Sequence, residues 1–346
     1  MQLPVSKEVN IDQQQELPVE FIFWRHIPEY VPELINELGN AEVILIETSP
    51  LIPKRKKAIV EALLNSLTGS ELTRKQQSLL GYTLGENYED YIEEHKDELS
   101  RNFTPEQLAI AQEFEGSGKT VRFLDANPTD NPDIIEDILA ARKYEEEATE
   151  KSSRGEIKSI DENIEQILEI ISFKAKSGRD RDKVAEAQIH DFMEQFEGKR
   201  IKVVYGSIHT GISHNMVRER LATRKFLGGS VVKQSYNLDS QIIRGEIFGK
   251  PVPENLASRL LLKMLISSLL IRENGSSGNQ EVIQSIRSFS SNSINASDLA
   301  NDIARDLTDD QVAKFEQVFD QSLKGHDPRD KKALDEFIDN LLKNRN

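Results

Sequence analysis

Cysteine is absent from this chain of 346 residues, and only 6% of its residues are aromatic. The lack of cysteine excludes a disulfide-linked scaffold and any zinc or iron–sulfur site built from cysteine ligands. Long apolar runs are missing too. The run from Leu260 to Ile271 is interrupted by Lys263 and falls short of the roughly 20 residues that a membrane-spanning helix needs. We therefore expect no transmembrane helix.

Positive charge is also scarce, because 59 acidic residues face 44 basic ones and give a formal net charge of −15. Binding to a phosphate backbone requires a basic face, so we expect no nucleic-acid partner. The first residues are polar and show no basic segment followed by an apolar one, which is the pattern of a secretory signal. Together with the lack of cysteine, this predicts a cytoplasmic protein.

Short apolar segments alternate with helical patterns along the chain. Runs rich in β-branched and apolar residues predict strands at 19–24, 41–47, 119–127, 201–205 and 230–237. Helical periodicity predicts helices between them, including 26–39, 181–196 and 215–226. Strands that alternate with helices are typical of a parallel sheet. We therefore predict an α/β fold with a mostly parallel central sheet flanked by helices.

Two charged helical stretches, at about 53–115 and 132–175, are too long for ordinary connections and are interpreted as helical insertions. We assign residues 1–250 to the α/β core and residues 251–346 to a helical C-terminal region. The apolar residues of that region, such as Leu260, Leu261, Leu262, Leu265 and Leu269, indicate either core packing or a dimer face. A homo-oligomer formed through this region is therefore one expectation.

Four chemically capable residues fall at or just after predicted strands. His26 follows the first strand, Glu47 ends the second, Asp125 belongs to the end of the third and His209 follows the fourth. Ligands of open parallel α/β sheets bind beyond the carboxyl ends of the strands. If the four strands are neighbours, the four side chains belong to one edge, and we assign them as catalytic residues.

Two chemistries remain open for this set. His26, Glu47 and His209 are sufficient to hold a catalytic divalent metal, such as Mn, Co, Zn or Fe, with one position left for water. Without a metal, one histidine acts as general base on water while a carboxylate orients its other ring nitrogen. Gly206 lets the backbone turn sharply, so that amide groups come near a substrate oxygen.

An Arg-Asp-Arg-Asp segment at 179–182 precedes the fourth strand. Its acidic residues suit the start of a helix, so helix capping is one interpretation. The other is that one arginine reaches the edge of the sheet and holds an anionic group of the substrate. The residues that we assign to substrate binding are Arg25, Gly206, Ser207 and Arg181.

Taken in order, these segments resemble the EreA/ChaN-like superfamily, which includes the TraB/PrgY/Tiki proteins, erythromycin esterases and ChaN-type haem-binding proteins. The residues of this chain that match the family's motifs are His26, Glu47, Asp125, an arginine within 179–182, and Gly206 with His209. The resemblance covers about 120 residues in scattered blocks. One departure is Phe23, which stands where the family has glycine in its first Gly-x-x-His element.

The resemblance implies an α/β core with a polar cleft, and either metal-dependent peptide hydrolysis or ester hydrolysis by a histidine base. We therefore expect a hydrolase that acts on a small molecule or a peptide. The alternative is a non-catalytic ligand-binding or regulatory module on a degenerate version of the same fold. A third interpretation is an interaction scaffold that works through residues 252–346.

Overall fold

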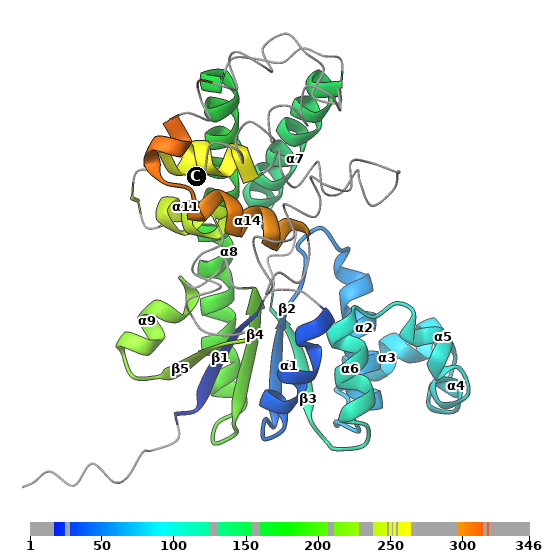
Figure 1. Ribbon diagram of the computed structural model, residues 1–346. Coiled ribbons are helices and arrows are strands. Elements are labelled where there is room, and N and C mark those ends of the chain that lie inside the picture. The colour runs from blue at the N-terminus through cyan, green and yellow to red at the C-terminus, as the bar shows by residue number, and fades with distance from the viewer. Residues whose placement is uncertain are drawn as a thin grey trace, which may run out of the picture.

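The computed structural model describes residues 17–24, 28–124, 131–153, 160–206, 211–227, 238–247, 249–250, 252–253, 255–263, 296–313 and 317. These residues form an α/β fold in which helices flank one parallel sheet (Figure 1). The predicted fold class is therefore confirmed. Helical insertions and C-terminal helices are present as well.

Five strands of the described chain make up the sheet. They are β1 (Val19–Trp24), β2 (Val43–Glu47), β3 (Thr120–Leu124), β4 (Ile201–Gly206) and β5 (Ala222–Phe226). All pairs are parallel, and the spatial order is β3-β2-β4-β1-β5. The three central strands are apolar along almost their whole length because helices cover both faces.

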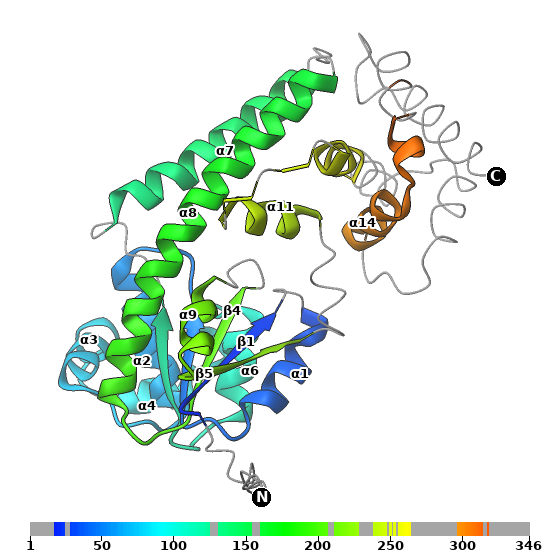
Figure 2. The same cartoon turned by 90° about the vertical axis from the view of Figure 1, so that its left-hand side faces the viewer.

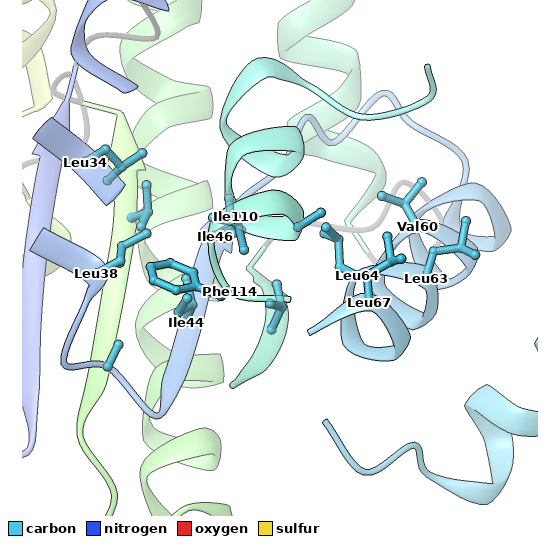
Figure 3. Close-up of a cluster of buried hydrophobic side chains, with 14 of the residues drawn as sticks. Leu34, Leu38, Ile44, Ile46, Val60, Leu63, Leu64, Leu67, Ile110 and Phe114 are labelled. Carbon is cyan, nitrogen blue, oxygen red and sulfur yellow. The ribbon is translucent and has the colours of Figure 1, made fainter. Parts of the chain in front are cut away.

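Strand periodicity divides the core into two clusters. One face of the sheet carries Ile22, Ile44, Ile46 and Val204, which pack against the first set of helices. These helices are α1 (Val31–Leu38), α2 (Lys54–Leu67) and α6 (Pro105–Glu113). The 3-10 helix η1 (Pro28–Tyr30) directly precedes α1. Figure 3 shows apolar side chains of α1, α2 and α6 gathered around those of β2.

The insertion between β2 and β3 also contains α3 (Arg74–Leu84), α4 (Tyr88–Glu94) and α5 (Lys96–Ser100). Helices α3 and α6 begin at capping boxes, in which Thr73 pairs with Gln76 and Thr104 pairs with Gln107. Each box satisfies two backbone N–H groups that would otherwise lack an intrahelical partner. Two helices of the predicted insertion, α3 and α6, therefore have starts that the local sequence encodes.

The opposite face of the sheet is covered by α8 (Ile160–Gln195) and α9 (Ile212–Arg218). Phe21, Phe23 and Tyr205 point to this face and pack with Ala185 and Ile189 of α8. Helix α7 (Pro132–Ser153) runs beside α8. The two helices extend beyond the carboxyl edge of the sheet (Figure 2).

Further helices lie on the carboxyl side of the sheet: α11 (Leu238–Ile247), a helix at 255–263 and α14 (Ala296–Asp306) (Figures 1 and 2). We call these three the helical lobe. Leu260, Leu261 and Leu262 are buried within the chain, which favours the core interpretation over a dimer face for these three. Leu265 and Leu269 lie outside the described residues.

One predicted helix differs from the structure. The helix predicted at 215–226 ends early, as α9 at Arg218, and Ala222–Phe226 forms the edge strand β5. Arg220 adopts a positive φ of 60° between them, which reverses the chain. The middle of β5 is polar and exposed, so it lacks the apolar signal of a buried strand. The strand predicted at 230–237 lies outside the described residues.

Candidate functional site

The strands that precede the four predicted catalytic residues are consecutive in the sheet, in the order β3-β2-β4-β1. Glu47 and Leu124 are partners at the ends of β2 and β3, and Trp24 and Gly206 are partners at the ends of β1 and β4. The carboxyl ends of the four strands therefore adjoin one another, as the sequence hypothesis required. The predicted residues that lie outside the described chain are Arg25, His26, Asp125, Ser207 and His209.

Glu47 is the predicted catalytic residue that the structure describes. In β2 it follows Val43 and Leu45, which face α8, and strand alternation directs its side chain to the same side. Its Oε1 atom accepts a hydrogen bond from Arg181 Nη2 at 2.6 Å. Its Oε2 atom accepts one from the backbone N–H of Gly206, also at 2.6 Å. Glu47 thus links β2 to the end of β4 and to α8.

Arg181 is the arginine of the 179–182 segment that reaches this edge. Its Nη2 atom also lies 3.5 Å from the backbone carbonyl of Thr48. The exposed fractions of the Arg181 and Glu47 side chains are 14% and 10%, so the ion pair is largely withdrawn from water. Burial acts to lower the pKa of Arg181, but the Glu47 carboxylate and other nearby groups raise it above its usual value.

The capping interpretation of this segment is wrong, because Arg179 to Asp182 lie inside α8 rather than at its start. The predicted helix at 181–196 is the second half of this 36-residue helix. The sequence suggested a helix start because acidic residues are common in the first turn of helices. In the structure, Arg181 turns toward the sheet and pairs with Glu47 at the end of β2.

Tyr205 is a site residue that the sequence analysis did not single out. It is fully buried on the face of the sheet that carries Glu47. Burial, and then the nearby Glu47 carboxylate, raise the pKa of its hydroxyl well above the usual value. The sequence did contain a signal for Tyr205, because it lies in an apolar strand directly before Gly206. A tyrosine buried in such a strand needs a partner for its hydroxyl group.

Lys57, in the first turn of α2, was also missed. Its exposed fraction is 6%. Burial, reinforced by the positive charge of Arg181, lowers the pKa of Lys57 to about 8. In the sequence it is one of four consecutive basic residues, a pattern that indicates a solvated surface and does not reveal which member is buried.

Phe23 stands where the resemblance predicts glycine. Its ring is buried and stacks on Phe21 and Phe226 at centroid distances of 5.8 and 5.3 Å. The side chain therefore belongs to the core between the sheet and α8. It contributes packing one residue before the end of β1.

A metal centre is not assembled by the residues that the structure describes: no group of three or more His, Cys, Asp or Glu side chains among them could hold an ion. Of the predicted ligands, only Glu47 is described, and both of its oxygens accept hydrogen bonds from protein groups. His26 and His209, the other predicted ligands, lie outside the described residues. The described donor set by itself does not fit a catalytic metal.

Comparison with protein-family models, curated proteins and solved structures finds no match. The resemblance to the EreA/ChaN-like superfamily therefore stays a prediction. Within the described part of the chain, no helix is both long and apolar enough to cross a membrane.

Proposed function

We propose that this protein is a hydrolase whose active site lies at the carboxyl edge of the sheet, where it cleaves an ester or peptide bond. The observation that carries the proposal is the buried Glu47–Arg181 pair at the meeting point of β2 and β4, beside the strand ends that lead to His26, Asp125 and His209. Buried charged pairs held at such an edge are expensive to desolvate and are typical of functional sites.

In the proposed reaction, His209 takes a proton from water, and the resulting hydroxide attacks the carbonyl carbon of the substrate. The C–O or C–N bond of the tetrahedral intermediate then breaks, and protonated His209 gives its proton to the leaving alcohol or amine. Glu47 accepts the N–H of Gly206, which holds the last residue of β4 in place directly before the segment that carries His209. Arg181 neutralises Glu47 and supplies positive charge near the developing oxyanion. His26 and Asp125 assist by orienting the base, and Arg25 and Ser207 contribute to substrate binding.

A metal-dependent form of the same proposal uses His26, Glu47 and His209 as ligands. A divalent ion such as Mn, Co, Zn or Fe would lower the pKa of bound water and so supply hydroxide. The two hydrogen bonds that Glu47 already accepts favour the form without a metal, because a carboxylate neutralised by arginine is a weaker ligand.

The test is His209→Ala, assayed on panels of ester and peptide substrates. We expect hydrolysis by the wild type and a loss of turnover of at least about 100-fold in the variant, since general-base catalysis contributes about 10²–10⁴-fold. His190→Ala is the matched control, because His190 is exposed on α8. Equal turnover in wild type and His209→Ala would refute the assignment. Elemental analysis of both proteins separates the two forms, because only the metal-dependent one predicts stoichiometric metal that is lost in the variant.

A second candidate is a non-catalytic ligand-binding module. It is favoured by Phe23, whose stacked ring fills the core where the resembling family has glycine. In this case the Glu47–Arg181 pair organises a binding edge without turnover. Absence of hydrolysis across the substrate panels, together with saturable binding of a small molecule or peptide, would support this candidate.

The proposed setting is the cytoplasm, which the lack of cysteine supports. The proposed partners are a small-molecule or peptide substrate and, through the C-terminal region, a second copy of the chain. Cell fractionation checks the compartment, and light scattering with and without residues 252–346 checks the oligomer.

A further inference from the structure

The sheet has two edge strands, β3 and β5. Side chains of α2 cover the backbone of β3, where Asn65 pairs with both backbone groups of Val121. Glu61, also on α2, accepts the N–H of Phe123. Strand β5 pairs with β1 on one side (Figure 1), and no described residue pairs with the backbone on its other side. Within the described chain, the outer side of β5 is therefore an open edge.

The pairing of β5 with β1 determines which backbone groups of β5 face outward. The N–H of Leu227 donates to the carbonyl of Phe23 in β1 at 2.9 Å. In a strand, the N–H and C=O of one residue point to the same side, and successive residues alternate. Thr223 and Lys225 therefore turn their backbone groups toward β1, as Leu227 does. The residues whose backbone groups point away from β1 are Ala222, Arg224 and Phe226. They offer alternating N–H donors and C=O acceptors to a further strand.

Positive charge lies at this open edge, although the chain as a whole carries a formal charge of −15. From Arg218 to Lys225 there are four basic residues and one acidic residue. Lys225 pairs with Glu37 of α1 at 2.6 Å. The arginines of this segment, Arg218, Arg220 and Arg224, are exposed, and no carboxylate of the described chain forms an ion pair with them. The edge thus combines open backbone groups with positive charge that these residues leave uncompensated.

Arg220 occupies the turn between α9 and β5 in an unusual conformation. Among the described residues it is the one non-glycine residue with a positive φ, which is 60°. Glycine adopts this region without steric cost, whereas a side chain makes it less favourable. Residues held in such conformations are often found at functional sites. Here the conformation places an arginine directly before the open strand.

We propose that the outer edge of β5 binds an extended acidic peptide, which adds a further strand to the sheet. The backbone of the peptide pairs with the outward N–H and C=O groups of β5. An Asp or Glu side chain of the peptide lies opposite Arg224, because cross-strand pairs of opposite charge stabilise a sheet. Arg218 and Arg220 attract the acidic peptide to the start of the strand. This binding does not depend on the hydrolase proposal, since no residue of β5 takes part in that reaction.

Two other occupants fit this edge less well. A second copy that paired through its own β5 would bring the basic residues of two edges together, and like charges that face each other are destabilising. A nucleic acid would compensate the positive charge through its phosphates. Phosphates are acceptors, however, and supply no donors for the outward carbonyls of β5. An acidic peptide supplies both the donors and the negative charge.

The experiment measures the binding of a fluorescently labelled peptide, in which valine alternates with glutamate, to the full-length protein by fluorescence anisotropy. We expect saturable binding to the wild type and an affinity at least about tenfold lower in Arg224→Glu, because like charges across an interface repel. Arg101→Glu is the matched control, since it reverses the charge of an exposed arginine after α5 and should bind as the wild type does. Absence of binding to the wild type, or equal affinities in wild type and Arg224→Glu, would overturn the inference.

Arg220→Gly separates binding from folding, because glycine accepts a φ of 60° without the steric cost of a side chain. We expect this variant to keep a melting temperature close to that of the wild type. Its affinity for the peptide should fall at least about threefold, since one of the attracting charges is removed.

Amide hydrogen exchange measured by NMR tests whether the peptide pairs with the backbone of β5. The N–H groups of Arg224 and Phe226 face outward, so we expect them to exchange more slowly when the peptide is bound. Those of Thr223 and Lys225 already face β1 and should change little. Bound peptide that leaves the exchange at Arg224 and Phe226 unchanged would overturn strand addition.

Two further measurements distinguish the other occupants. A single-stranded thymidine oligonucleotide that binds as tightly as the peptide would show that the edge recognises negative charge alone, and would overturn the peptide as its occupant. Slow exchange at Arg224 and Phe226 in the protein without peptide, increasing with protein concentration, would assign the edge to a second copy. We expect neither result.

Discussion

Glu47 shows how one side chain at a strand end connects three elements. Its carboxylate accepts hydrogen bonds from Arg181 of α8 and from the backbone of Gly206 in β4. Its position at the end of an apolar run was evident from the sequence, and so was its candidacy for the site. Its partner was not, because Arg181 lies 134 residues away in a segment that resembles a helix start.

Replacing Glu47 by glutamine should destabilise the protein by about 3–5 kcal/mol, since it leaves the Arg181 charge buried without its carboxylate partner. The measurement is the free energy of unfolding in urea. Asp180→Asn, which removes an exposed ion pair with Lys183 on α8, is the control and should cost less than about 1 kcal/mol. A Glu47→Gln cost as small as that of the control would show that the pair is not energetically important.

Lys57 should make stability depend on pH in the alkaline range. Its folded-state pKa, about 8, is below the ordinary value of 10.5, so the unfolded chain binds more protons between these values. The contribution of Lys57 to the free energy of unfolding therefore increases, and the folded state becomes more stable, as the pH rises from 7 to 10.5.

We expect the stability of the wild type relative to Lys57→Met to increase over that interval by up to about 3 kcal/mol, since each pKa unit corresponds to about 1.36 kcal/mol. Urea unfolding of both proteins at several pH values from 7 to 10.5 checks this. Lys56→Met, which removes an exposed lysine, should follow the wild type. A constant difference between wild type and Lys57→Met would contradict the lowered pKa.

At the scale of elements, α2 protects the free edge of the sheet. Strand β3 is an edge strand, and the amide of Asn65 on α2 pairs with both backbone groups of Val121, at 2.8 Å each. Glu61 accepts the N–H of Phe123 at 2.8 Å. These side chains take the place of a neighbouring strand and satisfy backbone groups that would otherwise be open to pairing with another chain.

Asn65→Ala should therefore cost about 2–4 kcal/mol, because it leaves a buried N–H and a buried carbonyl of Val121 without these partners. Urea unfolding gives the cost, and light scattering tests whether the opened edge promotes aggregation. Asn102→Ala, at an exposed position, should change stability by no more than about 0.5 kcal/mol. Equal free energies of unfolding in the two variants would show that the hydrogen bonds from Asn65 to β3 do not stabilise the protein.

Local pattern accounts for many of the elements and fails at the strand that lacks it. The apolar runs predicted β1, β2, β3 and β4 to within a few residues, and the Thr-x-x-Gln spacings mark the starts of α3 and α6. Strand β5 was missed because its middle residues are exposed and polar. A strand at a sheet edge is held by backbone pairing with its neighbour, here β1. Such pairing does not require an alternating pattern of apolar residues in the sequence.

At the scale of the whole molecule, the helical lobe has its own internal connections. Asn301 of α14 accepts a hydrogen bond from the buried N–H of Leu238 at 2.9 Å. Arg259 donates to the carbonyls of Ala304, Arg305 and Leu307 near the end of α14. The middle and the C-terminal end of α14 are thus tied to the other two helices of the lobe.

Asn301→Ala should loosen the lobe while the sheet stays protected, because the lost acceptor lies within the lobe and regions of a protein open with different free energies. Hydrogen exchange measured by mass spectrometry should show faster exchange in α11, in 255–263 and in α14, with β2 and β4 unchanged. Asp310→Ala, at an exposed position shortly after α14, is the control. Faster exchange in β2 and β4 as well would show that lobe and sheet unfold together.

The sequence by itself determined the α/β class, the positions of the central strands and the candidacy of Glu47, because burial and strand ends leave local signals in residue type and spacing. Only the tertiary structure decided that β2 and β4 are neighbours, that Arg181 and not Arg179 pairs with Glu47, and that Lys57 and Tyr205 are buried beside them. These facts depend on strand order and on the packing of distant elements, and contacts between residues more than 100 positions apart leave no periodic signal in the chain.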